Sequence, residues 1–532
     1  MVGWPSSASI GIRTKFRTIR RGEARGKLKL GKQKAEMGWR KTEVRRLAFS
    51  IGTRMAPKKD LLALGVTCRG EPKSLAASRA RTYFDRMIEP SRLVSRRVSR
   101  VALSFALLGL LLGTPGRAEN WPQWRGPYFN GSTTETNLPT QWSKTENVAW
   151  VAPLPGQSGA TPVVWEDSVF VSSPDEQKRL LLLCLDRKSG QVRWQKVVSE
   201  GDRQVGLNNA ASPSPATDGK RVFVMFATGD LAAFDFAGQE LWKRNLAKEY
   251  GRFANMWMLG SSPLLYGGKL YVQILQSNPR PEDYTHALGD PPARESFLLC
   301  LDPQSGTNLW RHIRPTDAIS ESQEAYTSPL PCAGAQGAEI LVLGADYVTA
   351  HAADTGVEVW RCGGLNVRKE RHWRMVPSAV LAEGLIIACA PRGDPVLAIK
   401  DGGKGLVTDA QIAWKLKEYP SDCVTPLFYR GKLFVLDGDH QVLTCVELRT
   451  GVKKWQGNLG VPHIFRASPA GADGKIYCLS ESGTTVVLEA GDEFKILATI
   501  PMGESPVRSS IAVAHGGLFI RTAKNLYCVR KP

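Results

Sequence analysis

The sequence predicts an all-β protein, an eight-bladed β-propeller built from four-stranded antiparallel blades. Three observations predict it. A turn pattern that ends on tryptophan recurs along the chain, and short apolar strands separated by glycine turns repeat at roughly 40–50 residues. No segment of the body shows a sustained helical period. The alternative is a seven-bladed propeller, which follows if one of the degenerate repeats does not form a blade.

The first 118 residues differ in charge from the rest of the 532-residue chain. They hold 27 of the 70 Lys and Arg residues but only 7 of the 50 Asp and Glu residues, so they carry the whole formal net charge of +20. Residues 119–532 are formally neutral. The basic balance therefore predicts no nucleic-acid binding by the folded part.

Residues 87–118 have the pattern of a secretory signal peptide. Arginines precede the apolar run 101–112, and Gly116 and Ala118 place small residues where a signal peptidase needs them. The run is too short to span a bilayer comfortably, so we expect no stable membrane anchor. We predict that translation starts at Met87 and that residues 1–86 are a mis-assigned upstream extension. The alternative is a start at Met1 with a basic, disordered extension. Either way, we expect a periplasmic or secreted protein.

Residues 119–532 are organised by a turn of Asp, three residues, Gly, three residues and Trp. The first copy is Asp186, Gly190 and Trp194. Further copies contain Gly306 with Trp310, and Gly451 with Trp455; the last has glutamate in the acidic position. Copies with shorter turns end at Trp242 and Trp360. A pattern repeated this often predicts a repeat architecture.

Each repeat opens with small residues and, in most copies, a proline before an apolar strand. These openings are at residues 160–162, 213–215, 261–263, 327–329, 376–378, 424–426, 467–469 and 508–510. The unit after the eighth opening lacks a closing tryptophan strand, whereas residues 147–150 form such a strand without a unit. We therefore expect this N-terminal strand to complete the last blade and close the ring.

The Ser/Thr-Pro openings and Asp-x-x-x-Gly-x-x-x-Trp closings resemble the PQQ-like propeller repeats of the quinoprotein alcohol dehydrogenase-like superfamily. The resemblance extends from Trp121 to the C-terminus, and this superfamily contains both enzymes and binding scaffolds. It implies that one set of residues docks neighbouring blades against each other. These residues are Trp150, Trp194, Trp242, Trp310, Trp360, Trp414, Trp455, Gly190, Gly306 and Gly451.

The resemblance also defines two functional alternatives. The superfamily's alcohol dehydrogenases carry a vicinal Cys-Cys pair over the quinone PQQ, together with a calcium site and an Asp base. This sequence has no Cys-Cys pair and no Cys-x-x-Cys-His haem motif. We therefore expect a non-catalytic scaffold without a cofactor. The alternative is a PQQ- and calcium-dependent oxidoreductase of alcohols or sugars.

Cysteines and histidines predict no metal site. Four of the nine cysteines after the signal segment occupy one repeat position, and we expect them to be small buried side chains in separate blades. The seven histidines are scattered, and no two have His-x-x-x-His spacing.

The remaining candidates for function lie just before the openings, where the chain enters the innermost strands. Side chains at this position should line one mouth of the central channel. They are Arg374, Arg466, Arg508, Asp422 and Tyr326, with His372 and Trp373 slightly further back. Three arginines near one axis suit an anionic ligand or a carboxylate-bearing peptide end; the alternative is that each pairs with a neighbouring Asp or carbonyl and seals the channel. We expect a protein or a small anionic ligand as partner, a monomeric propeller, and recognition loops at residues 276–296 and 361–374.

Overall fold

The computed structural model describes residues 118–278, 294–335, 337–392, 394–407 and 409–532. The predicted upstream extension, the predicted signal peptide up to residue 117 and most of the 276–296 insertion lie outside these ranges. Within them, no helix has the length and apolar character needed to cross a membrane.

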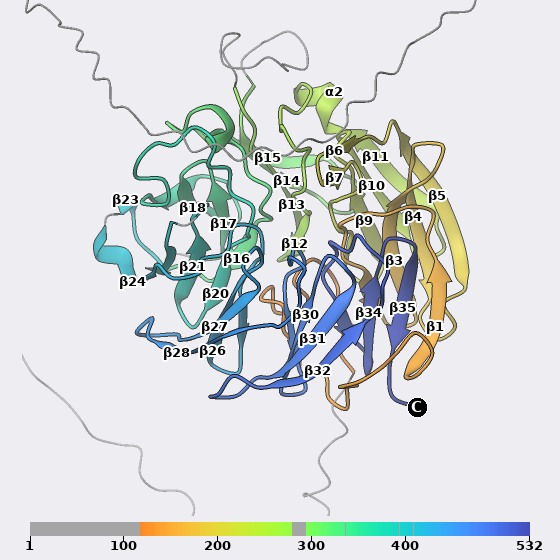
Figure 1. The fold of residues 1–532 in the computed structure, drawn as a ribbon. Helices are drawn as coiled ribbons and strands as arrows, with labels where there is room; N and C mark the ends of the chain where they lie inside the picture. Colours follow the sequence, from red (N-terminus) through yellow and green to blue (C-terminus); the bar gives the residue numbers. More distant parts are fainter. Residues whose placement is uncertain (1–117, 279–293, 336, 393, 408) are drawn as a thin grey trace, which may run out of the picture. The chain divides into compact units, whose positions relative to one another are not determined.

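The repeats form eight sheets that follow one another in chain order (Figure 1). Blades 1 and 2 consist of β2 (Val163–Trp165), β3 (Ser168–Pro174), β4 (Arg179–Asp186) and β5 (Val192–Glu200), and of β8 (Ala216–Thr217), β9 (Arg221–Met225), β10 (Asp230–Asp235) and β11 (Glu240–Asn245). Blades 3 and 4 consist of β12 (Leu264–Tyr266), β13 (Lys269–Ile274), β14 (Phe297–Leu301) and β15 (Asn308–Ile313), and of β16 (Leu330–Cys332), β17 (Glu339–Gly344), β18 (Tyr347–Ala352) and β19 (Glu358–Cys362).

Blades 5 to 7 repeat the arrangement, with the inner strand named first. They consist of β20 (Val380–Ala382), β21 (Leu385–Cys389), β22 (Val396–Lys400) and β24 (Ile412–Leu416); of β25 (Leu427–Tyr429), β26 (Lys432–Asp437), β27 (Val442–Glu447) and β28 (Lys453–Asn458); and of β29 (Ala470–Ala472), β30 (Lys475–Leu479), β31 (Thr484–Glu489) and β32 (Ile496–Pro501).

Blade 8 is built from both ends of the propeller. Its first three strands are β33 (Ala512–Ala514), β34 (Gly517–Arg521) and β35 (Asn525–Val529), and its outer strand is β1 (Val148–Pro153). In Figure 1 the orange strand β1 lies beside the blue strand β35, and Trp150 is opposite Cys528 in the register. The eight-bladed propeller closed by an N-terminal strand is thus confirmed, and the seven-bladed alternative is excluded.

A few elements lie outside this scheme. Strand β23 (Gly405–Val407) leaves blade 5 and pairs in parallel with β19, which makes blade 4 five-stranded. A two-stranded hairpin, β6 (Gln204–Val205) and β7 (Asn208–Asn209), stands between blades 1 and 2. The helical segments of the described residues are α2 (Leu246–Tyr250) and the 3₁₀-helices η3 (Ser320–Gln323) and η4 (Asp409–Gln411).

The hydrophobic core lies in the layers between blades. Strand β4 illustrates why the middle strands are apolar on both faces: Leu182 and Cys184 pack toward blade 2, whereas Leu181 and Leu183 pack toward blade 8. A strand enclosed by two neighbouring sheets reads as a continuous apolar run. The nine cysteines from Cys184 to Cys528 are all unpaired thiols, and eight of them are buried.

Tryptophans of the outer strands join each blade to the next. Trp150 of blade 8 donates its indole N–H to Arg187 O of blade 1 at 2.7 Å, and its ring lies against Gly190. A Cβ at Gly190 would come within 2.5 Å of this ring, so only glycine fits there. The corresponding N–H bonds run from Trp194 to Phe236 O, Trp242 to Pro303 O, Trp310 to Ala353 O, Trp414 to Leu448 O and Trp455 to Gly491 O. Gly306 lies under Trp242 in the same way, and Gly451 lies under Trp414.

Trp360 differs from the other six docking tryptophans. It is fully buried, and its indole N–H donates to Glu339 Oε2 of its own blade at 3.2 Å. Strand β23 runs along β19 beside it, and the turn of blade 5 that would accept this N–H is replaced by the segment leading to β23. Burial raises the pKa of the Glu339 carboxyl. Trp360 therefore packs at the interface of blades 4 and 5 without a hydrogen bond across it.

Candidate functional site

A cavity of about 350 Å³ lies on the axis of the propeller. Its wall includes Ser214, Ser262, Ser328, Ser378, Thr425, Ser468 and Ser510, one from the opening of each blade from 2 to 8. The same openings give every inner strand its small hydroxyl residue, so the repeat itself places a hydroxyl group at the axis in each blade.

These hydroxyl groups form a belt that links neighbouring blades. Ser214 Oγ accepts the backbone N–H of Thr161 at 2.9 Å, and Ser262 Oγ accepts that of Ser214 at 3.0 Å. The remaining bonds follow in chain order from Ser262 to Ser328, Ser378, Thr425, Ser468 and Ser510, each at 2.9–3.0 Å. Each oxygen is used as an acceptor, which leaves its O–H available as a donor toward the cavity.

An N-terminal segment, residues 121–133, closes one end of the channel. Pro122 O accepts the N–H of Thr217, and the Gln123 amide bonds the backbone of Leu265 at 2.9 and 3.2 Å. Arg125 donates to Pro426 O at 2.6 Å and Pro469 O at 2.9 Å. These partners follow the hydroxyl belt in their strands, so the segment lies on the side of the belt opposite the predicted mouth. Trp124 of this segment lines the cavity as its floor.

At the open mouth, every predicted arginine has an acidic partner. Arg508 contacts Glu481 Oε1 at 2.6 and 2.7 Å, and Arg466 Nη2 lies 2.9 Å from Asp439 Oδ1. Arg374 lies 3.4 Å from Glu321 Oε1 and 4.0 Å from Asp422 Oδ2. The three positive charges are therefore offset by four carboxylates, and the mouth presents both signs of charge.

Aromatic side chains complete the mouth. Tyr326 donates to Glu324 Oε2 at 2.6 Å and accepts the Trp257 backbone N–H at 3.1 Å. Burial and the nearby Glu324 raise the pKa of Tyr326 well above its usual value, so the phenol is a neutral hydrogen-bonding group. The Trp257 indole donates to Glu321 Oε1 at 2.9 Å, and its ring lies against Gly206.

The β6–β7 hairpin reaches the same mouth from between blades 1 and 2. Leu207 O at its tip accepts from Arg508 Nη1 at 2.9 Å, and the Asn208 amide donates to Trp257 O at 3.1 Å. Leu207 and Trp257 line the cavity, yet they remain 50% and 38% exposed. The mouth thus carries two exposed apolar side chains beside its ion pairs.

The structure brings together five of the seven predicted site residues. Arg374, Asp422, Arg466, Arg508 and Tyr326 all line the cavity. His372 and Trp373 do not. The His372 ring is largely exposed and lies 3.5 Å from Glu321 Oε2, and Trp373 is buried with Arg368 over its ring at 4.8 Å.

Sequence reasoning missed several lining residues. Trp124 was visible as part of an aromatic N-terminal stretch, but nothing in the sequence shows that the stretch crosses the channel. Trp257 and Leu207 lie in connections of irregular length, outside the repeat positions. Cys423, next to Asp422, also lines the cavity, and burial together with Asp422 raises its pKa to about 12, which keeps it a neutral thiol.

Residues 132–278 and 344–494 match the family model described as outer membrane protein assembly factor BamB, a model of PQQ-like repeats. These ranges make up more than half of the chain. The chain belongs to this PQQ-like propeller family.

Solved structures share the fold of this PQQ-like propeller. BamB from Moraxella catarrhalis has 14% identity and a TM-score of 0.51, with 72% of this chain and 99% of that chain covered. A europium-containing methanol dehydrogenase has 12% identity and a TM-score of 0.55, with 79% and 90% covered. A quinohemoprotein alcohol dehydrogenase from Comamonas testosteroni has 13% identity and a TM-score of 0.53, with 78% and 81% covered. No curated protein sequence matches the chain.

The cavity of this PQQ-like propeller does not fit a calcium-bound quinone. Calcium takes 6–8 oxygen ligands, mostly carboxylates and carbonyls. Asp422 is the only acidic residue among those that line the cavity in the described ranges, and its Oδ1 accepts the Arg392 N–H at 3.1 Å. The carboxylates behind it, on Glu321, Asp439 and Glu481, already face arginines.

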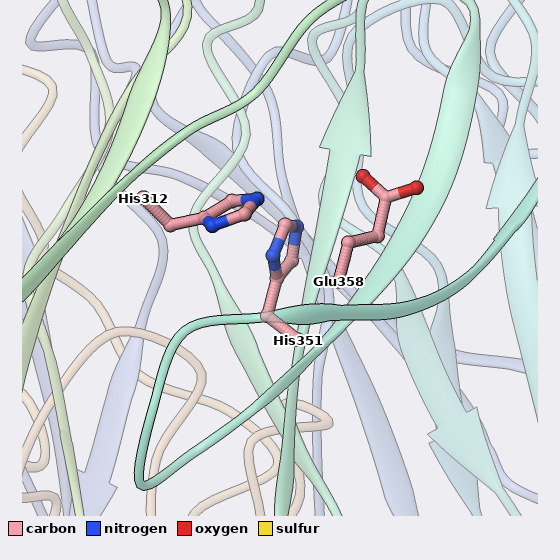
Figure 2. A group of neighbouring side chains, drawn as sticks. All are labelled: His312, His351 and Glu358. Atoms are coloured by element: carbon pink, nitrogen blue, oxygen red, sulfur yellow. The ribbon is translucent and has the colours of Figure 1, made fainter.

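A second cluster lies away from the cavity, between blades 3 and 4 of the PQQ-like propeller. Figure 2 shows His312, His351 and Glu358, whose nearest ligand atoms lie within 4.8 Å of one another. The polar atoms of His351 and Glu358 are already engaged in other contacts. His351 Nδ1 bonds Gly356 O at 3.0 Å and its Nε2 bonds Thr349 Oγ1 at 2.9 Å, while both Glu358 oxygens contact the Arg361 guanidinium.

Electrostatics also disfavours a cation in this cluster. Burial, with a contribution from the adjacent Arg314, lowers the pKa of His351 to about 3. Burial also lowers the pKa of His312. The same low-polarity surroundings and the same arginine would oppose a metal ion. We therefore assign this cluster to the packing of blade 3 against blade 4.

Proposed function

We propose that the chain is an exported, non-catalytic binding or assembly scaffold that holds a segment of a partner protein at the mouth of its central cavity. The observation that carries the proposal is the combination of exposed Leu207 and Trp257 with partly buried ion pairs around one cavity. Apolar anchors, tryptophan above all, surrounded by polar groups are typical of protein-binding surfaces. The family description as an assembly factor supports the same role.

The charges at the mouth favour a protein segment over a small anion. A site for an anion would present arginines without competing carboxylates. Here Glu321, Asp439 and Glu481 already offset the charges of the three arginines. An anion would have to displace a carboxylate, whereas a peptide can pair its own donors and acceptors with both signs. A small anionic ligand is the alternative occupant of the mouth, and a separate binding assay tests it.

The predicted signal peptide places this scaffold in the periplasm or outside a bacterial cell. The formally neutral body and the predicted absence of a stable anchor fit a monomeric propeller whose exposed mouth is free for a partner. The location rests on residues 87–118 and is part of the proposal.

Site-specific photocrosslinking in exporting cells tests the partner. A photoreactive residue in place of Leu207 or Trp257 should give one adduct of defined mass, while the same residue in place of Val452, which is 61% exposed in the turn of blade 6, should give none. A charge reversal at the mouth, Arg466→Glu, should reduce the adduct. Equal adducts from Leu207 and Val452, or none from any mouth position, would contradict the proposal.

Two binding assays separate the alternatives. Titration with PQQ and calcium, followed by quinone absorbance and dye reduction with alcohols or sugars, tests the oxidoreductase. Turnover there would replace the scaffold proposal. Isothermal titration with citrate and phosphate tests the anionic ligand, and Arg508→Ala should abolish any heat that arises at the mouth.

A further inference from the structure

Glu135 is a buried carboxylate without a basic side chain as its partner. It is 8% exposed, and it accepts the backbone N–H groups of His515 at 2.9 Å and Gly516 at 2.7 Å. Burial lowers the pKa of the His515 imidazole, which favours its neutral form. Within the described ranges, no Lys or Arg side chain forms an ion pair or hydrogen bond with Glu135. A buried carboxylate that lacks a cation is costly, and the cost falls sharply when one is supplied.

A third nitrogen points at this carboxylate. The backbone N of Glu119 lies 2.5 Å from Glu135 Oε1. The Glu119 side chain is fixed by three donors, namely the Tyr128 hydroxyl at 2.5 Å, the Thr134 N–H at 2.8 Å and the Thr133 hydroxyl. The position of the Glu119 nitrogen is therefore set by contacts of its own residue and does not depend on the chain before it.

Glu119 is also the first residue after the predicted signal peptide. Gly116 and Ala118 provide the small residues before the bond between Ala118 and Glu119. Hydrolysis by a signal peptidase breaks the C–N bond and adds the water oxygen to the Ala118 carbonyl carbon, which becomes a carboxylate. Both protons of the water pass to the Glu119 nitrogen. The nitrogen beside Glu135 then changes from a neutral amide to an α-ammonium group, because an α-amine is protonated at neutral pH.

We propose that the chain is processed between Ala118 and Glu119, and that the new α-ammonium group of Glu119 forms a partly buried ion pair with Glu135. Residues 119–135 then carry a charged anchor at their first residue. Glu135 joins this anchor to the turn between β33 and β34 in blade 8.

The ion pair fastens the segment that closes the channel. Trp124 and Arg125 follow Glu119 by a few residues, and Gly131 and Thr133 bond the backbone of Gly471 in blade 7. Before processing, a chain that continues through Ala118 leaves Glu135 with amide donors alone. Processing thus supplies the missing positive charge and completes the closure of one end of the cavity.

The first experiment maps the N-terminus of the exported protein. The full chain is expressed in an exporting bacterium, and the product is analysed by intact mass and N-terminal sequencing. We expect Glu119 as the first residue. A product that begins at another residue, or that keeps the apolar segment 101–112, would overturn the proposal.

The second experiment measures the reactivity of the α-amine in the processed protein. An aldehyde reagent selective for N-terminal amines should label folded wild-type protein slowly, because the ion pair keeps the amine protonated and shielded. Glu135→Gln should label about tenfold faster, which corresponds to a pKa change of one unit. Glu146→Gln, an exposed glutamate of the same N-terminal region, should label like wild type. Equal rates in wild type and Glu135→Gln would overturn the ion pair.

A third variant keeps Glu135 and covers the case in which Glu135→Gln does not fold. One alanine inserted after Ala118 moves the ammonium group one residue away from Glu119. This product should label fast and melt a few degrees below wild type. An unchanged melting temperature together with slow labelling would contradict the proposal. None of these readouts depends on a partner at the mouth, so they stand apart from the test of the proposed function.

Discussion

Ser214 Oγ accepts the backbone N–H of Thr161 at 2.9 Å, and the same bond recurs between all later neighbours around the ring up to Ser510. At the closing step, between blade 8 and blade 1, Thr161 Oγ1 is buried and has no hydrogen-bond partner within the described residues. Two threonines therefore occupy equivalent positions in the belt but differ in their hydrogen bonding. Thr425 Oγ1 accepts the N–H of Ser378, whereas Thr161 Oγ1 accepts nothing.

These two threonines provide a matched test of the belt. Thr425→Val should lower the free energy of unfolding by about 1–3 kcal/mol, because it leaves the buried N–H of Ser378 without an acceptor. Thr161→Val removes a hydroxyl that makes no bond and should be neutral or slightly stabilising. Urea unfolding of both variants measures the difference. Equal losses would show that the hydroxyl bonds do not hold the blades together.

The packing of a docking tryptophan against a glycine predicts that two glycine variants differ in stability. Gly190→Ala places a Cβ 2.5 Å from the Trp150 ring, whereas a Cβ at Gly431 meets nothing within 4 Å. Both glycines have nearly the same positive φ, 73° and 71°, so the backbone strain of the two alanines is alike. Gly190→Ala should cost about 1–3 kcal/mol more than Gly431→Ala, as overpacking does. Thermal unfolding of the pair measures it, and similar melting temperatures would contradict docking by Trp150.

The repeat positions allowed most of the fold to be predicted. The strand that ends at Trp150 had no unit of its own and the last unit had no closing strand, so ring closure through β1 followed from counting. Strand β23 could not be predicted in this way, because it leaves blade 5 and pairs in parallel with blade 4. The sequence of these three residues has no pattern that indicates which sheet they join. Because β23 occupies this place, the Trp360 indole N–H bonds Glu339 of its own blade and makes no hydrogen bond to blade 5.

The site was predictable only where it coincides with the repeat. Arg374 and Arg466 precede openings and Arg508 begins one, and their place before the inner strands puts them at the mouth. Their acidic partners could not be foreseen: Glu481 is 27 residues before Arg508 and lies in the hairpin of another blade. His372 and Trp373 fall where the chain is still in a connecting loop, so no strand register directs their side chains toward the axis.

The buried His351 predicts a loss of stability in acid. Its pKa is about 3 in the folded protein, through burial first and Arg314 second, against about 6.5 when unfolded. Because the folded pKa is lowered, the stabilisation is complete above pH 6.5 and is lost as the pH falls toward 3. His312, Glu358 and Arg314 face the ring and share in the effect.

Urea unfolding between pH 7 and pH 4.5 measures this contribution. His351→Gln should be less stable than wild type at pH 7, because the bonds to Thr349 and Gly356 are disturbed, but its stability should fall less steeply with acid. His463→Gln, at an exposed position, should follow the slope of wild type. If His351→Gln kept the full wild-type slope, protonation of His351 would not be the cause.

Arg125 holds the segment that closes the channel, and its removal should release that segment locally. Its guanidinium donates to the carbonyls of Pro426, Pro469 and Asn130, and burial lowers its pKa to about 9, so it remains charged at neutral pH. Its φ of 68° means that Arg125→Gly removes the side chain without adding backbone strain.

The loss of Arg125 should be seen in the exchange of two backbone amides. Thr217 and Leu265 bond Pro122 and Gln123 of the closing segment. Because bonds to charged donors contribute about 1.5–3 kcal/mol, these amides should exchange at least about tenfold faster in Arg125→Gly. Hydrogen exchange with mass spectrometry resolves this, with the interior of β9 as the unchanged reference. Exchange at Thr217 and Leu265 as slow as in wild type would mean that residues 121–133 stay in place without Arg125.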